Sequence, residues 1–224
     1  MKDFNKIVQE FKSDEFKQKY RNKEMLLDND EHLKYAVIVK AYKDMQLRTV
    51  RKTNTNAQLD TSAKEEVLKW LVGEINRCFH NKDYENKAEF DKWHNSICEK
   101  FVADFNNRVL KDNYRPISYG KAQKILNMSF KYLRCFDDAN LHLSLFRNCH
   151  MPIDSLVINW YNDNNVGGDN KINCFWSNFN ESCYSNIQNN IRQFCENGKE
   201  NLSPLEMDFY VWKEEKEKKK RSAK

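Results

Sequence analysis

Glycine and proline are scarce in this chain, which has five Gly and three Pro among 224 residues. Tight turns depend on these two residues, because Gly accepts left-handed backbone and Pro presets φ. Sandwiches and barrels of β-strands need many such turns, so the composition argues against them. The chain is long enough for a sizeable core and carries 14 Phe, 10 Tyr and 5 Trp to fill it. We therefore expect an all-α, compact multi-helix fold.

Long apolar runs are also lacking, and none approaches the roughly 20 residues that a membrane-spanning helix needs. No secretory signal pattern occurs at the start of the chain. The seven cysteines form no CxxC pair, and an odd number scattered through helical patterns is typical of reduced thiols. We expect a soluble cytoplasmic protein with no membrane contact, no bound metal and no cofactor.

The charge balance is weakly basic, with a net charge of +5. Much of the excess lies in residues 213–224, which we expect to form a charged tail, helical at first and then frayed. Such a balance permits nucleic-acid binding without requiring it. Residues 1–212 would form a single mainly helical domain. Two lobes within it, residues 1–110 and 111–212, would share a central helix.

Apolar residues recur at helical spacing along most of the chain. Thr61 or Ser62 would open one helix, and Asn180 would cap another that Gly198 ends. Residues 141–146 read as a single helical turn or a brief strand. Polar tracts at 51–58 and 162–171 predict loops. Helices are predicted over residues 2–26 (as one or two pieces), 32–50, 61–79, 84–110, 118–136, 152–161, 180–196 and from 203 onward.

Residues 118–136 give the central helix, with Ser118 as its predicted cap, and it has two faces. Its apolar face carries Ala122, Ile125, Leu126, Ser129, Tyr132, Leu133 and Phe136. Its polar face carries Lys121, Lys124, Asn127, Lys131 and Arg134, with Gln123. On this pattern alone, the polar face is expected to meet water.

A second helix start follows at Met151-Pro152-Ile153-Asp154-Ser155. Pro152 has the preset φ of a first helical turn, and Asp154 in that turn would be favoured by the helix dipole.

The order of these parts resembles the helix-hairpin-helix DNA glycosylases over residues 116–160. That superfamily has a Pro/Gly turn, a Lys near the start of an amphipathic helix, and then a Pro-hydrophobic-Asp helix start. The spacing is similar to that of the archaeal 8-oxoguanine glycosylases. The resemblance places Gly120 at the hairpin glycine, Lys124 at the catalytic lysine and Asp154 at the catalytic aspartate. It implies a DNA N-glycosylase, with AP-lyase activity in addition, acting on double-stranded DNA.

The chemistry explains why such an enzyme needs these residue types. Cleavage of an N-glycosidic bond builds positive charge on the sugar, which a nearby carboxylate stabilises. An amine whose pKa is lowered by burial can attack C1′ and form a Schiff base. The nucleotide must first leave the duplex and stack in an aromatic pocket. For that base pocket we expect Trp160, Phe175, Trp176, Cys149 and His150. For DNA phosphates we expect Ser118, Gly120, Lys121, Lys131 and Arg134.

Each of these residues also has a structural interpretation. Lys124 would be a solvated lysine, Asp154 a helix cap, and Cys149 and His150 packed core residues. Trp212 falls in a helical stripe, which predicts a core position. The competing function is a non-catalytic helical module that binds nucleic acid or protein, from a mobile element or defence system. We expect a monomer, and for an enzyme Lys124 and Asp154 must open into one cleft between the lobes.

Overall fold

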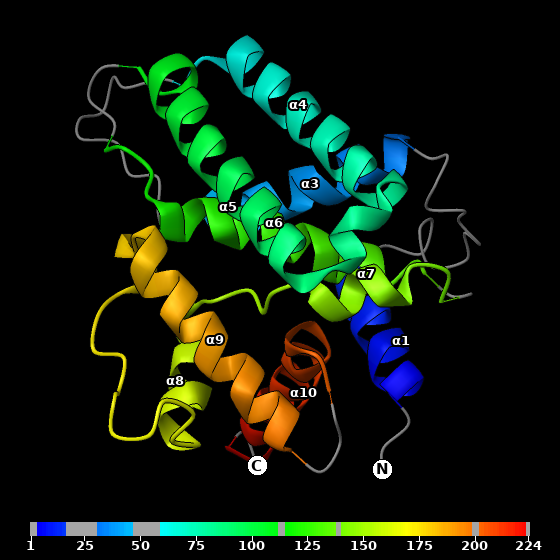
Figure 1. Cartoon of the computed structure of the whole chain (residues 1–224), viewed down its shortest axis with the longest axis vertical. Coiled ribbons are helices and arrows are strands. Elements are labelled where there is room, and N and C mark those ends of the chain that lie inside the picture. The colour runs from blue at the N-terminus through cyan, green and yellow to red at the C-terminus, as the bar shows by residue number, and fades with distance from the viewer. Residues whose placement is uncertain are drawn as a thin grey trace.

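The computed structural model describes residues 4–16, 31–46, 59–111, 115–137, 140–198 and 202–222 (Figure 1). These ranges are almost entirely helical and contain no β-strand, so the all-α prediction is confirmed. An isolated antiparallel bridge joins Leu59 to Leu110. Among the described helices, none combines the length and the apolar character that crossing a membrane requires. The predicted loop at 51–58 lies outside the described residues.

The N-terminal half provides α1 (Phe4–Glu15), α3 (Glu31–Gln46), α4 (Thr61–His80) and α5 (Lys87–Asp104). A short 3₁₀ turn, η1 (Lys82–Glu85), precedes α5, and a π-helical turn, η2 (Phe105–Val109), continues it. The single helix predicted over 84–110 is therefore divided into a 3₁₀ turn, an α-helix and a π-helical turn. Asn86 makes the break, because its side chain accepts the free N–H groups of Ala88 and Glu89 at the start of α5.

The C-terminal half provides α6 (Tyr119–Arg134), α7 (Leu143–Asn148), α8 (Ser155–Asp163), the 3₁₀ turn η3 (Trp176–Asn178), α9 (Glu181–Asn197) and α10 (Pro204–Ser222). The ambiguous segment around residue 143 is thus helical. The charged segment that begins at residue 213 is helical as far as Ser222, as part of α10. Its lysines make this possible by pairing with acidic residues, as Lys216 does with Asp14 of α1.

Helix ends were predicted well where asparagine and glycine signal them. Asn180 caps α9 by accepting the N–H of Cys183 at 2.9 Å, and Gly198 ends the same helix. Helix α4 begins at Thr61, one of the two predicted starts, and its N-cap is the preceding residue, Asp60. The Asp60 carboxylate accepts the N–H of Ala63 at 2.9 Å.

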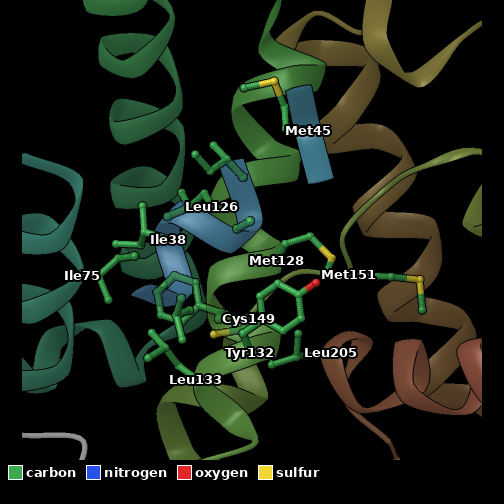
Figure 2. Packing of buried hydrophobic residues seen from close by; sticks show 14 of the residues in the cluster. Ile38, Met45, Ile75, Leu126, Met128, Tyr132, Leu133, Cys149, Met151 and Leu205 are labelled. Carbon is green, nitrogen blue, oxygen red and sulfur yellow. The ribbon is translucent and has the colours of Figure 1, made fainter. Parts of the chain in front are cut away.

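Helix α6 occupies the centre of the molecule, with α3 and α5 on one side and η3 and α9 on another (Figure 1). Figure 2 shows its apolar side, where Leu126 and Leu133 pack with Ile38 of α3 and Ile75 of α4. Every residue of α6 is buried, including its lysines. The expectation that its polar face meets water is therefore wrong, because elements later in the chain cover that face and supply polar partners.

The first and last described helices pack against each other. Phe11 of α1 makes edge-to-face ring contacts with Phe209 and Trp212 of α10, at centroid distances of 5.1 Å and 5.0 Å. Helix α1, from the first predicted lobe, thus lies with the C-terminal helices of the second. Together α1 and α10 form one wall beside α6.

Gly120 lets the η3 segment approach α6 at backbone distance. Its N–H donates to the carbonyl of Phe179 at 3.0 Å. A Cβ at position 120 would lie 1.9 Å from the carbonyl oxygen of Trp176, far inside the contact distance. The glycine therefore serves chain packing at this point.

We expect Gly120→Ala to lower the free energy of unfolding by about 1–3 kcal/mol, since backbone must shift to admit the methyl group. Gly73→Ala is the matched control, because Gly73 lies inside α4 and its Cβ would meet only Arg77, at 4.0 Å. That change should stabilise the protein by about 0.5–1 kcal/mol. Urea unfolding followed by circular dichroism measures both. Equal stability of Gly120→Ala and the parent would show that η3 is not tied to α6.

Candidate active site

A groove of about 1000 Å³ runs along the covered polar side of α6. Helix α6 forms its floor, and the start of α8, η3, α1 and α10 form its walls. The groove combines charged and aromatic side chains. Those that bear on chemistry are Lys121, Lys124, Lys131, Asp154, Phe175, Trp176, Asp208 and Trp212.

Lys124 and Asp154 meet in this groove although they are 30 residues apart in sequence. The Nζ of Lys124 donates a hydrogen bond to Oδ2 of Asp154. The Lys124 side chain is 8% exposed and that of Asp154 is 31% exposed, so the pair is reached from the aspartate side. The ring centroid of Trp176 lies 5.9 Å from the same Nζ. The solvated-lysine interpretation is therefore wrong, because the start of α8 and η3 enclose Lys124.

Asp154 is the N-cap of α8, one residue before the helix begins. Its Oδ1 accepts the N–H groups of Leu156 and Val157, each at 3.0 Å. Pro152 accordingly precedes the helix and is not in its first turn. Burial opposes ionisation of Asp154, but Lys124 and the α8 N–H groups outweigh it and hold the pKa below its usual value. Asp154 is thus a fixed carboxylate at neutral pH.

A second ion pair lies two turns further along α6. Nζ of Lys131 is 2.6 Å from Oδ2 of Asp208, and both side chains are 5% exposed. The rings of Phe11 and Phe209 flank the amine at 4.5 Å and 5.1 Å from their centroids. Burial raises the pKa of Asp208, although Lys131 opposes the shift, and the charge of Asp154 raises it further.

Asp208 was missed by the sequence analysis, yet α10 carries a signal for it. The residue falls on the same helical face as Leu205 and Trp212, three positions after one and four before the other. A carboxylate on an apolar stripe must find a buried partner or a site. Lys131 is that partner.

Aromatic residues line the groove unevenly. Phe175 is 77% exposed, and Trp176 is half-buried. Trp212, which its stripe placed in the core, is also half-buried and contributes to the groove wall. Trp160 is different, because it is buried against Phe194 and is not part of the wall. The predicted role of Trp160 in a base pocket thus has no support from its position.

Cys149 and His150 also lie away from the groove. Cys149 is fully buried, and its Sγ donates to the carbonyl of Leu145 at 3.5 Å. His150 sits 2.8 Å from Asp91 of α5 and 2.7 Å from the Tyr184 hydroxyl of α9. Burial lowers the pKa of His150 to about 4, so its ring is neutral at physiological pH. Both residues are core residues behind α6, as the structural interpretation had it.

The predicted phosphate site at the start of α6 has its polar groups engaged inside the chain. Ser118 is the N-cap residue, but its Oγ donates to the carbonyl of Ser177 at 2.5 Å and makes no side-chain cap. The Gly120 N–H already binds Phe179. Lys121 lines the groove beside Arg115, and burial together with that charge lowers its pKa.

Arg134 has a structural position at the other end of α6. Its guanidinium donates to the carbonyl of Asp137 at 3.1 Å and to the side chain of Asn140 at 2.7 Å. It is not among the residues that line the groove. Of the basic residues assigned to DNA phosphates, Lys121 and Lys131 lie in the groove and Arg134 does not.

Within the described ranges, no group of three or more His, Cys, Asp or Glu side chains could hold a metal ion. Comparison with protein-family models, with curated proteins and with solved structures found no match. The class of the protein therefore follows only from its own fold and groove. It is an all-α protein with a lysine–aspartate pair in an aromatic-walled groove.

The burial of the Lys131–Asp208 ion pair predicts how substitutions in it change the free energy of unfolding. Asp208→Asn should lower the free energy of unfolding by about 3–5 kcal/mol, because it leaves the Lys131 charge buried without its partner. The double variant Lys131→Met with Asp208→Leu should recover most of that loss. Urea unfolding of the parent and both variants measures this. A double variant as unstable as Asp208→Asn would contradict the ion-pair description.

Proposed function

We propose that this protein is a DNA glycosylase with AP-lyase activity, which excises a damaged or modified base from a flipped-out nucleotide. The proposal depends chiefly on one observation, the contact of Lys124 Nζ with Asp154 Oδ2 inside an open groove. It is also supported by the resemblance of residues 116–160 to the helix-hairpin-helix glycosylases, which implies these same two residues.

Lys124 would act as the nucleophile and must be a neutral amine when it attacks. Its nitrogen forms a bond to C1′ of the deoxyribose while the N-glycosidic bond breaks. The departing base takes the electron pair of that bond together with the proton that the amine gives up. Opening of the sugar ring then leaves a Schiff base between Lys124 and C1′. Loss of a C2′ proton expels the 3′ phosphate, which is the lyase step.

Asp154 would stabilise the positive charge that develops on the sugar. Two α8 N–H groups stabilise the ionised carboxylate and fix its orientation, and they continue to do so once Lys124 has lost its proton. Oδ1 is occupied by those N–H groups, and Oδ2 accepts from Lys124, so the carboxylate and the amine lie side by side in the groove. A carboxylate held in this way does not need to reorganise when the charge appears.

The rest of the groove would receive the base. Trp176, beside Lys124, and Trp212 offer ring surfaces, and Lys131 with Asp208 offers hydrogen-bonding groups. Stacking and hydrogen bonding there would offset the few kcal/mol needed to unstack a nucleotide. The groove volume of about 1000 Å³ lies at the upper end of the roughly 300–1,000 Å³ range of ligand pockets.

A non-catalytic nucleic-acid-binding module is the second candidate. The observation in its favour is the lysine-rich end of α10, where Lys219 and Lys220 border a shallow pocket next to Trp212. A third lysine of this pocket, Lys216, is already paired with Asp14. Such a surface would attract phosphates without performing chemistry.

Borohydride trapping on duplexes that carry oxidised, deaminated or alkylated bases tests the enzyme. The parent should become covalently linked to one class of duplex. Lys124→Gln should abolish the link, and Asp154→Asn should slow single-turnover base release by about 10²–10³-fold. Asparagine is itself a good cap, so α8 should still form in the second variant.

The matched controls are Lys100→Gln and Asp104→Asn, which break an exposed lysine–aspartate pair of 2.8 Å on α5, away from the groove. Both should leave trapping and base release unchanged. Binding of DNA by the parent without trapping on any duplex would refute the glycosylase and favour the binding module. The same conclusion follows if Lys124→Gln and Asp154→Asn alter stability alone.

A further inference from the structure

The chain reaches Asp154 through a connector, Met151-Pro152-Ile153, which is buried and bonded to side chains of α6 and α9. No neighbouring strand is available in the described ranges to satisfy its backbone groups. Two glutamine side chains do so instead. Gln123 of α6 bonds Ile153, and Gln188 of α9 bonds Met151.

Gln123 pairs with Ile153 in the way one strand pairs with another. Its Nε2 donates to the Ile153 carbonyl at 2.9 Å, and its Oε1 accepts the Ile153 N–H at 3.2 Å. The same Nε2 donates to the carbonyl of Gly120 at 2.9 Å, and Oε1 also accepts from Asn127 at 3.0 Å. Both amide protons and both oxygen lone pairs are therefore used. The residue is fully buried, so this arrangement is not exchanged for water.

The adjoining network fixes which end of the amide faces which partner. The Ile153 N–H and carbonyl fix the Gln123 oxygen and nitrogen, so Asn127 must donate to Gln123, and the oxygen of Asn127 lies 2.8 Å from Nε2 of the buried His94. Its Nδ2 also reaches the Tyr184 hydroxyl at 2.7 Å. If the Gln123 amide were rotated by 180°, its NH₂ group would face the donors of Ile153 and Asn127, and its oxygen would face the Ile153 carbonyl. Only one orientation of the amide is therefore compatible with these partners.

We propose that Gln123 is a positioning residue that sets the register of Asp154 against Lys124, an inference that rests on the proposed function. Gln123 and Lys124 are consecutive in α6, and Ile153 and Asp154 are consecutive in the connector. The hydrogen bonds between Gln123 and Ile153 therefore fix the position of Asp154 relative to Lys124. A slip of one residue in the connector would move the carboxylate by about 3.3 Å and separate it from the amine.

The first test compares Gln123→Met with a control of the same chemistry. Asn162 makes an equivalent reciprocal pair with Ile172, at 3.0 Å and 2.9 Å, without touching the connector. At a temperature where all proteins are folded, Gln123→Met should slow single-turnover base release by about 10- to 100-fold. Its DNA Kd should change less than twofold. Asn162→Leu should leave both quantities unchanged, and equal rates for all three proteins would overturn the proposal.

The isosteric variant Gln123→Glu adds a pH dependence. A neutral carboxylic acid has one donor and one acceptor, as the amide has toward Ile153, whereas the ionised form presents only acceptors to the carbonyls of Ile153 and Gly120. Burial raises the pKa of a glutamate at this position, so the side chain becomes neutral as the pH falls. The rate of Gln123→Glu relative to the parent at the same pH should therefore rise on acidification. A ratio that stays constant would overturn the proposal.

A readout without DNA separates this inference from the enzyme itself. Carboxyl ¹³C NMR should show Asp154 titrating below its usual range in the parent and in Asn162→Leu. In Gln123→Met the titration should return toward the ordinary value, because Asp154 loses Lys124. If it does so and the parent still traps no duplex, the glycosylase fails while Gln123 keeps its positioning role. If Asp154 titrates identically in parent and variant, the positioning role fails.

Discussion

The complete burial of α6, a helix with lysines on one side, is the constraint that shapes the rest of the structure. A buried charge without a partner costs several kcal/mol, so the elements that cover Lys124 and Lys131 must bring acceptors for them. The start of α8 brings Asp154 to Lys124, and α10 brings Asp208 to Lys131. The groove is the space left between these covering elements. Its chemistry is thus a by-product of how the helix is enclosed.

Side-chain amides take the place of a β-sheet in this helical protein. In three connectors of the described ranges, an Asn or Gln side chain both donates to and accepts from a single backbone residue, and the connector before α8 has two such side chains. This pairing replaces the ladder that strands would supply, at the cost of burying a polar side chain that must be fully satisfied. The pairs are Asn106 with Ile117, Gln123 with Ile153, Asn162 with Ile172, and Gln188 with Met151.

Much of the helical fold was predictable, because helical periodicity and Asn or Gly end signals are local. The meeting of Lys124 and Asp154 was also anticipated, from a resemblance that covers both residues. Asp208 and Gln123 were missed because their roles depend on partners far along the chain. Three lysines on one face of a helix indicate a solvated surface when those partners are not known. Gly120 was assigned to a ligand, but the backbone of Trp176 fills the space that its missing side chain leaves.

That close approach has a consequence for how the groove adapts to what enters it. The carbonyl of Trp176 rests on α6 with no side chain between them, so this aromatic wall moves only if the central helix moves. Conformational adjustment is therefore left to the opposite side, where α1 and α10 meet through ring contacts. An occupant would dock on this fixed surface and be enclosed by α1 and α10. The entropic penalty of ordering the protein on binding would be small at the Trp176 wall and larger at α1 and α10.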